Sequence, residues 1–177
     1  MRNCGSSSFT TMRRNTEIRF YNVLFPVWIL VFFPSWLWLI LIPGNYLIDR
    51  TVLYFSLKGS ERNAFCRKHS WKICLAGFLA DFVGALFLFA VSLAATMIQP
   101  VNNDYANYLL LNHFRSVPAL VTVIAAIALS GVLIFLLDRK ILEKAGLSGE
   151  AAHHSALVLA LVTAPYLFLI PASLIYV

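Results

Sequence analysis

Charged residues are scarce in this chain. Only 12% of its 177 residues are Asp, Glu, Lys or Arg, whereas about 25% is usual in soluble domains. Hydrophobic residues make up 60% of the sequence, which leaves too little polar surface to cover a water-exposed globule. The composition therefore excludes an ordinary soluble protein and predicts that lipid is the solvent for most of the chain.

Cysteines and cofactor motifs are also few. The three cysteines, Cys4, Cys66 and Cys74, form an odd set that gives no disulfide framework. Cys66 and His69 have a C-x-x-H spacing, but no second pair follows to complete a tetrahedral zinc site. The chain has no H-E-x-x-H motif and no glycine-rich phosphate loop. No cofactor or metal is predicted.

One short motif concerns catalysis. The segment Gly146-Leu147-Ser148-Gly149 resembles the GxSG serine-nucleophile motif of rhomboid-type intramembrane proteases. In those enzymes the serine starts a buried helix and pairs with a histidine on another helix, whereas here the match lies in a hydrophilic loop. A nucleophile, base and metal constellation is missing, so an enzyme is disfavoured.

Long apolar runs dominate what is present. About 20 apolar residues cross the hydrocarbon core of a bilayer, and the sequence has four regions with this character. We predict an all-α polytopic helical bundle in which residues 20–177 form one membrane domain and the polar, basic tail 1–19 is disordered. The predicted membrane regions are 20–57, 73–98, 117–137 and 155–176.

The distribution of cations predicts orientation in a cell membrane. Segments 58–72 and 138–154 are rich in Lys and Arg and are expected to be cytoplasmic loops, whereas 99–116 is poor in cations and is expected outside. The net charge of +6 is therefore assigned to membrane orientation and to contact with anionic lipid head groups, and not to nucleic acid.

The first membrane region has conflicting signals. A single crossing by residues 20–42 would put the basic tail outside, against the positive-inside rule. A break at Pro43-Gly44-Asn45 would resolve this, because residues 45–57 reach only about 20 Å of a core about 30 Å thick. We therefore predict a Pro-broken helix or a re-entrant hairpin, with a plain crossing as the alternative.

Asp81 is the most unusual residue of the second region. An ionised carboxylate inside an apolar run costs several kcal/mol unless it is paired or hydrated, and such residues often contact ions or substrates. Small residues at helical spacing surround it and predict close packing against another helix. These predicted packing residues are Ala76, Gly77, Ala80 and Gly84. The alternative role of Asp81 is a buried polar tie between helices.

Asn45, Asp49 and Arg50 form a second polar group. We predict that they contact an ion or substrate, with Arg50 pairing with Asp81. The alternative is that Asp49 and Arg50 lie at the cytoplasmic interface and extend their charged ends into water.

Two functions follow from these features. A broken helix and a buried carboxylate are typical of transporters, so the sequence predicts an oligomeric transporter or channel for an ion or small solute. The alternative is a structural or regulatory subunit that binds a larger membrane protein through its small-residue faces. In either case the chain is expected to be a homo-oligomer or to have a membrane-protein partner.

Overall fold

The computed structural model describes residues 38–57, 62–98 and 104–171. This part of the chain is almost entirely helical and contains no strand, so the all-α class is confirmed for it. The α-helices are α1 (Trp38–Ser56), α2 (Arg62–Ile98), α3 (Asp104–Leu111), α4 (Val117–Lys144) and α5 (Gly149–Thr163). Two 3-10 helices, η2 (His113–Arg115) and η3 (Tyr166–Leu169), follow α3 and α5.

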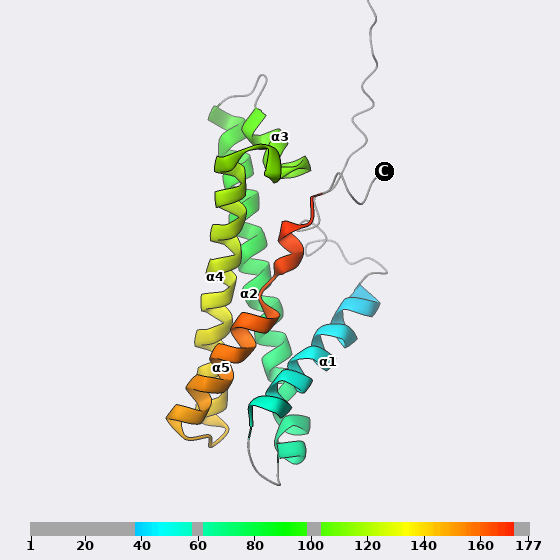
Figure 1. The fold of residues 1–177 in the computed structure, drawn as a ribbon, viewed down its shortest axis with the longest axis vertical. Coiled ribbons are helices and arrows are strands. Elements are labelled where there is room, and N and C mark those ends of the chain that lie inside the picture. The colour runs from blue at the N-terminus through cyan, green and yellow to red at the C-terminus, as the bar shows by residue number, and fades with distance from the viewer. Residues whose placement is uncertain (1–37, 58–61, 99–103, 172–177) are drawn as a thin grey trace, which may run out of the picture.

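The two longest helices, α2 and α4, form an antiparallel pair against which the other elements pack (Figure 1). Helices α1 and α5 pack against one half of this pair and against each other, which makes that half a four-helix bundle. Helix α3 lies at the other end of the pair. We call the half where α2 starts and α4 meets α5 the basic end, because it carries Arg62, Arg67, Lys68, Lys140 and Lys144.

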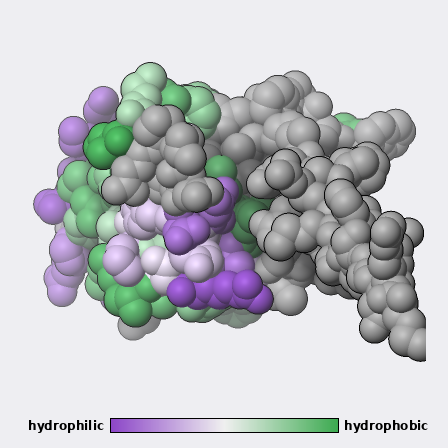
Figure 2. All heavy atoms as spheres, turned by 90° about the horizontal axis from the view of Figure 1, so that it is seen from above, coloured by the Kyte–Doolittle hydropathy of each residue, from purple (hydrophilic) through white to green (hydrophobic). Residues whose placement is uncertain are grey.

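Three helical segments are long and apolar enough to cross a membrane: Arg62–Ile98, Val117–Lys144 and Gly149–Leu169. Their outward faces expose large apolar side chains, among them Leu79, Val121 and Leu161. At the α3 end, hydrophilic side chains gather with hydrophobic ones beside them (Figure 2). The three apolar segments and their exposed apolar faces are compatible with a membrane protein. Part of the predicted first region, residues 20–37, lies outside the described residues.

The predicted turn at Pro43-Gly44-Asn45 is wrong, because α1 runs unbroken from Trp38 to Ser56 with Pro43 inside it. Proline lacks the N–H that would bond to the carbonyl four residues earlier, here that of Leu39. Pro43 is exposed and lies in the second turn of α1, so one hydrogen bond near the helix start is the main loss. The other arm of the predicted hairpin lies outside the described residues.

The two segments predicted as cytoplasmic loops are mostly helical. Helix α2 already begins at Arg62 and α4 continues to Lys144, so residues 145–148 alone join α4 to α5. The 37 residues of α2 span about 55 Å, more than the hydrocarbon core of about 30 Å, so its basic first turns can lie beyond that core. On which side of the membrane this end lies stays a prediction.

The GxSG segment forms the tight turn between α4 and α5. Gly146 has a φ of +96°, a conformation that favours glycine. Ser148 is the N-cap of α5, and its side-chain oxygen accepts a hydrogen bond from the Ala151 amide at 3.4 Å. The serine therefore has a structural role in starting a helix.

Proline ends α5 well before residue 176, where the predicted last membrane region ends. Pro165 cannot donate to the carbonyl of Leu161, and α5 stops at Thr163. The Tyr166 hydroxyl donates to that carbonyl oxygen at 2.6 Å, which satisfies the group that the proline leaves unbonded. The following η3 turn brings Phe168 into the core between α2 and α4.

Candidate ion-contact site

An apolar layer closes the four-helix half of the molecule near its basic end. One buried hydrophobic cluster has a member from each of the four helices at this level, namely Leu53, Cys66, Leu142 and Ala152, and its other members, Ile73, Ala156 and Leu159, lie further into the bundle. These residues pack in one cluster, so α1, α2, α4 and α5 meet at this level.

A polar layer lies one helical turn further into the bundle. On α1 and α4, which run toward the basic end, the residues four positions before Leu53 and Leu142 are Asp49 and Asp138. On α2 and α5, which run away from it, Ser70 and Ser155 follow the apolar layer by four and three positions. The exposed fractions are only 5% for Asp49, 1% for Asp138 and Ser155, and zero for Ser70. We call Asp49, Ser70, Asp138 and Ser155 the polar layer.

The carboxyl groups of this region act on one another. Asp49 accepts a hydrogen bond from the Cys74 thiol, which lies one turn beyond Ser70 on α2. Asp49 also interacts electrostatically with both Asp138 and Asp81. Three acids from three different helices are therefore gathered around the interior of the bundle, with Asp81 about 10 Å further along α2 than Cys74.

Most polar atoms of the layer have no hydrogen-bond partner among the described residues. Both carboxyl oxygens of Asp138 and the hydroxyl oxygens of Ser70 and Ser155 are buried and unbonded, as is one carboxyl oxygen of Asp81. Buried polar groups in native proteins are nearly always satisfied, and each exception needs an explanation. The donor set, carboxyl and hydroxyl oxygens, suits protons or a hard cation.

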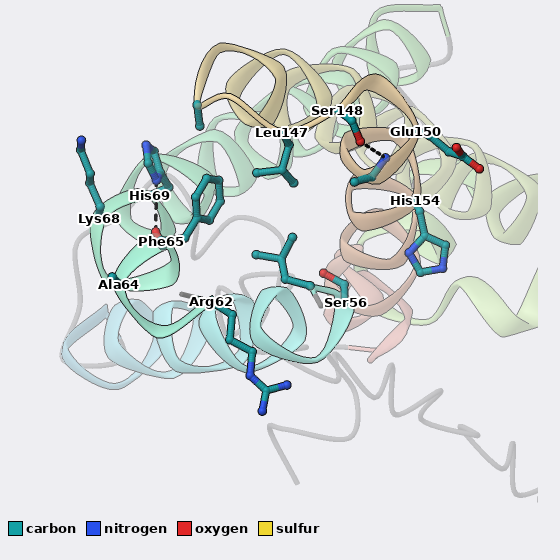
Figure 3. A pocket seen from close by; sticks show the side chains of 13 residues that line it. Ser56, Arg62, Ala64, Phe65, Lys68, His69, Leu147, Ser148, Glu150 and His154 are labelled. Carbon is teal, nitrogen blue, oxygen red and sulfur yellow. Dashed lines mark hydrogen bonds between the residues drawn. The ribbon is translucent and has the colours of Figure 1, made fainter. Parts of the chain in front are cut away.

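A multidentate metal centre does not fit the described residues, where no trio of His, Cys, Asp and Glu side chains is close enough to hold a metal ion. Cys66 and His69, the C-x-x-H pair of α2, contact other parts of the protein and are not arranged as metal ligands. Cys66 is buried in the apolar layer, and the Nδ1 atom of His69 lies 3.1 Å from the carbonyl oxygen of Phe65 (Figure 3).

The predicted contact residues are not all brought together. Asp49 lies in the polar layer and Asp81 within its electrostatic reach. Asn45 is half-buried one turn from Asp49 on the same face of α1. Arg50 does not pair with Asp81: it lines a recess on the outside of the α1–α2 contact, and the ion pair found among the described residues is Arg139–Glu143.

Asp138 is the site residue that the sequence prediction missed. Its position beside Arg139 and Lys140 suggested a loop, but it lies on the buried stripe of α4. The signal was its spacing: Asp138 follows Ser130 and Ile134 at intervals of four residues, which puts all three on one helix face.

The four residues of the predicted packing face on α2 have different surroundings. Ala80 and Gly84 are buried against α4, where Ser130 donates to the carbonyl oxygen of Ala80. Ala76 is buried as well. Gly77 has no neighbour within 4 Å of where its side chain would begin, so it contributes no close approach within the described chain.

A large recess of about 960 Å³ opens at the basic end, outside the apolar layer (Figure 3). Its inner wall includes Leu57, Phe65 and Leu147, which pack against the apolar layer. The apolar layer therefore separates the recess from the polar layer. Its rim includes Arg62, whose guanidinium lies 4.1 Å from the Tyr54 ring centre.

No family model, curated protein or solved structure matches this chain. The geometry of the bundle interior is therefore the basis for a functional assignment. Its main features are the three interacting carboxyl groups and the unbonded polar atoms around them.

Proposed function

We propose that the protein carries protons or a small monovalent cation across a membrane, and that the polar layer is the site where the ion is held. One observation supports this above all: Asp138 is 1% exposed in a helix apolar enough to span a bilayer, and neither of its carboxyl oxygens has a partner among the described residues. Buried ionisable residues in membrane helices are costly and commonly mark ion pathways. Ser70 directly precedes Trp71, so this layer lies at the basic end of the apolar span, where an ion would enter, and Asp81 lies deeper in the span.

Charge favours a cation over an anion. Asp49 and Asp138 both line the layer, and Asp81 interacts with Asp49. Among the described residues, the ion pair between Arg139 and Glu143 lies on the exposed surface and leaves these acids unneutralised. Negative charges at low dielectric repel each other strongly, so protons or a cation must accompany them. Such a site attracts cations and excludes anions.

The alternative function, a structural subunit, predicts a different use for the same residues. In that case the carboxyls would be polar ties between helices, and their titration would not matter. A carboxamide in place of the carboxyl keeps shape and hydrogen-bonding capacity but removes the charge.

Flux through liposomes tests the proposal. Purified protein is reconstituted, and proton and Na⁺ flux are measured for the wild type, Asp138→Asn, Asp49→Asn and Asp81→Asn. We expect the Asp138 and Asp49 variants to lose at least about tenfold in flux, because the ion loses a charged ligand. Asp104→Asn is the matched control, because Asp104 is exposed at the α3 end.

The outcomes separate the two functions. Wild-type flux that disappears in Asp138→Asn but persists in Asp104→Asn supports an ion pathway. Absence of flux from the wild type, together with one stable partner co-purified from native membranes, would instead favour the structural subunit. The described residues include three helical segments long enough to cross a membrane, which is few for a wide pathway. We therefore propose that the protein works as an oligomer, which crosslinking in native membranes would test.

A further inference from the structure

A second recess lies on the outside of the contact between α1 and α2. Its volume is about 450 Å³, and its lining residues are Arg50, Asn63, Ala64, Arg67 and Lys68. Three of these five side chains are cationic and none is acidic. The recess is separate from the polar layer and from the proposed ion pathway.

The cations of this recess are not neutralised within the described chain. The ion pair found there joins Arg139 and Glu143 on α4, and no described acid pairs with Arg50, Arg67 or Lys68. Three uncompensated positive charges around one hollow favour an anion with several acceptor oxygens.

The start of α2 strengthens the positive potential. Asn63 and Ala64 lie in the first turn of this 37-residue helix, where backbone N–H groups lack helical partners and the helix dipole is positive. The Asn63 side chain is exposed and can donate a further hydrogen bond. Side chains and backbone therefore favour the same kind of ligand.

The position of the recess along α2 indicates where the anion comes from. Trp71 follows Arg67 by one helical turn and is 57% exposed. The centre of its ring lies 6.2 Å from the centre of the Tyr46 ring on α1. Exposed Trp and Tyr of membrane helices prefer the level of the lipid head groups. The apolar span begins immediately beyond, at Ile73. The recess therefore lies at head-group level.

We infer that this recess binds the phosphate of an anionic phospholipid head group. Arg50 from α1 and Arg67 and Lys68 from α2 surround the phosphate, and the acyl chains lie along the exposed apolar face below Trp71. Because the ligand bridges α1 and α2, its binding strengthens the contact between the two helices.

Native mass spectrometry of the full chain in neutral detergent tests the inference. Phosphatidylglycerol is the probe, with phosphatidylcholine as the lipid that carries no net charge. Arg67→Gln with Lys68→Gln removes two cations from the recess, and both residues are exposed, so the fold is kept. Lys140→Gln with Lys144→Gln is the matched control, because it removes two exposed cations elsewhere at the basic end.

We expect the recess variant to lose about 25-fold in phosphatidylglycerol affinity, at about fivefold for each of the two cations removed. The control variant should lose less than about threefold, as screening of distant surface charges requires. Equal losses in the two variants would mean general surface attraction and would overturn the site.

Inorganic phosphate distinguishes the source of the anion. If the lipid is the ligand, millimolar phosphate should displace phosphatidylglycerol only weakly, because the acyl chains add apolar contacts. Displacement at equal concentrations of phosphate and lipid would show a site for a soluble anion and would overturn the lipid assignment.

Discussion

The hydroxyl of Ser130 on α4 donates a hydrogen bond of 3.1 Å to the backbone carbonyl oxygen of Ala80 on α2. Both residues are fully buried, and Gly84 lies one turn further along α2 against the same serine. A side chain on Gly84 would meet Ser130 Oγ, and also Ala126 O at 3.3 Å and Phe168 at 3.2 Å. Glycine therefore permits the close approach that fixes the register of α2 against α4.

Gly84→Ala should destabilise the fold by about 1–3 kcal/mol, because the added methyl group meets packed backbone and side chains. Gly77→Ala is the control, since open space surrounds Gly77 and alanine is the better helix former. The measurement is thermal unfolding in detergent. Combining Gly84→Ala with Ser130→Ala removes the nearest clash and should recover part of the loss. Equal stability of the two glycine variants would contradict this packing.

Asp138→Leu should raise the thermal stability of the protein, by about 1–3 kcal/mol, while it removes ion flux. An apolar side chain next to Ile134 and Leu142 has no desolvation cost, whereas the buried carboxyl has unbonded oxygens. Unfolding in detergent and flux in liposomes are measured on the same preparation. A drop in stability would show that the carboxyl ties helices together.

Acid should weaken the contact between η2 and η3. His113 is buried, and its Nε2 atom lies 3.1 Å from the carbonyl oxygen of Leu169. Burial lowers the pKa of His113 below 6.5, and the hydrogen bond to the carbonyl opposes this in part. Below pH 6.5 the unfolded chain therefore binds more protons than the folded one, so stability present above pH 6.5 is lost as the pH falls.

The measurement is the melting temperature between pH 8 and pH 5. His113→Gln keeps a hydrogen-bond donor without a titrating ring, so we expect a flatter pH dependence and a cost of about 1 kcal/mol at neutral pH. The same pH dependence in the variant would show that other groups cause it.

Cysteine labelling tests the predicted sidedness. Asn107 at the α3 end and Arg67 at the basic end are both exposed, whereas Cys66 and Cys74 are buried. With an impermeant thiol reagent on intact cells, Asn107→Cys should react and Arg67→Cys should react only after lysis, since cations favour the cytoplasmic side. The parent protein gives the background. The reverse pattern would invert the orientation.

Much of the fold could be predicted from the sequence. The apolar runs around Asp81 and before Arg139 predicted long helices. Local signals failed at Pro43, where a proline in the second turn costs too little to stop a helix that packs against α2. They also failed for the basic segments, because lysine and arginine are good helix formers and mark an interface without ending a helix.

The sequence by itself indicated that lipid is the solvent for most of the chain. The preference of an apolar run for the bilayer is a sum of side-chain transfer free energies, so it can be read without knowing how the helices pack. The sequence also identified Asp81 as a costly charge in an apolar run and Asp49 as a candidate ion contact. Only the tertiary structure decided that Asp138 joins them and that Arg50 does not. Which side chains meet across four helices depends on register and crossing angle, and these follow from contacts between residues far apart in the chain, such as Ser130 and Ala80.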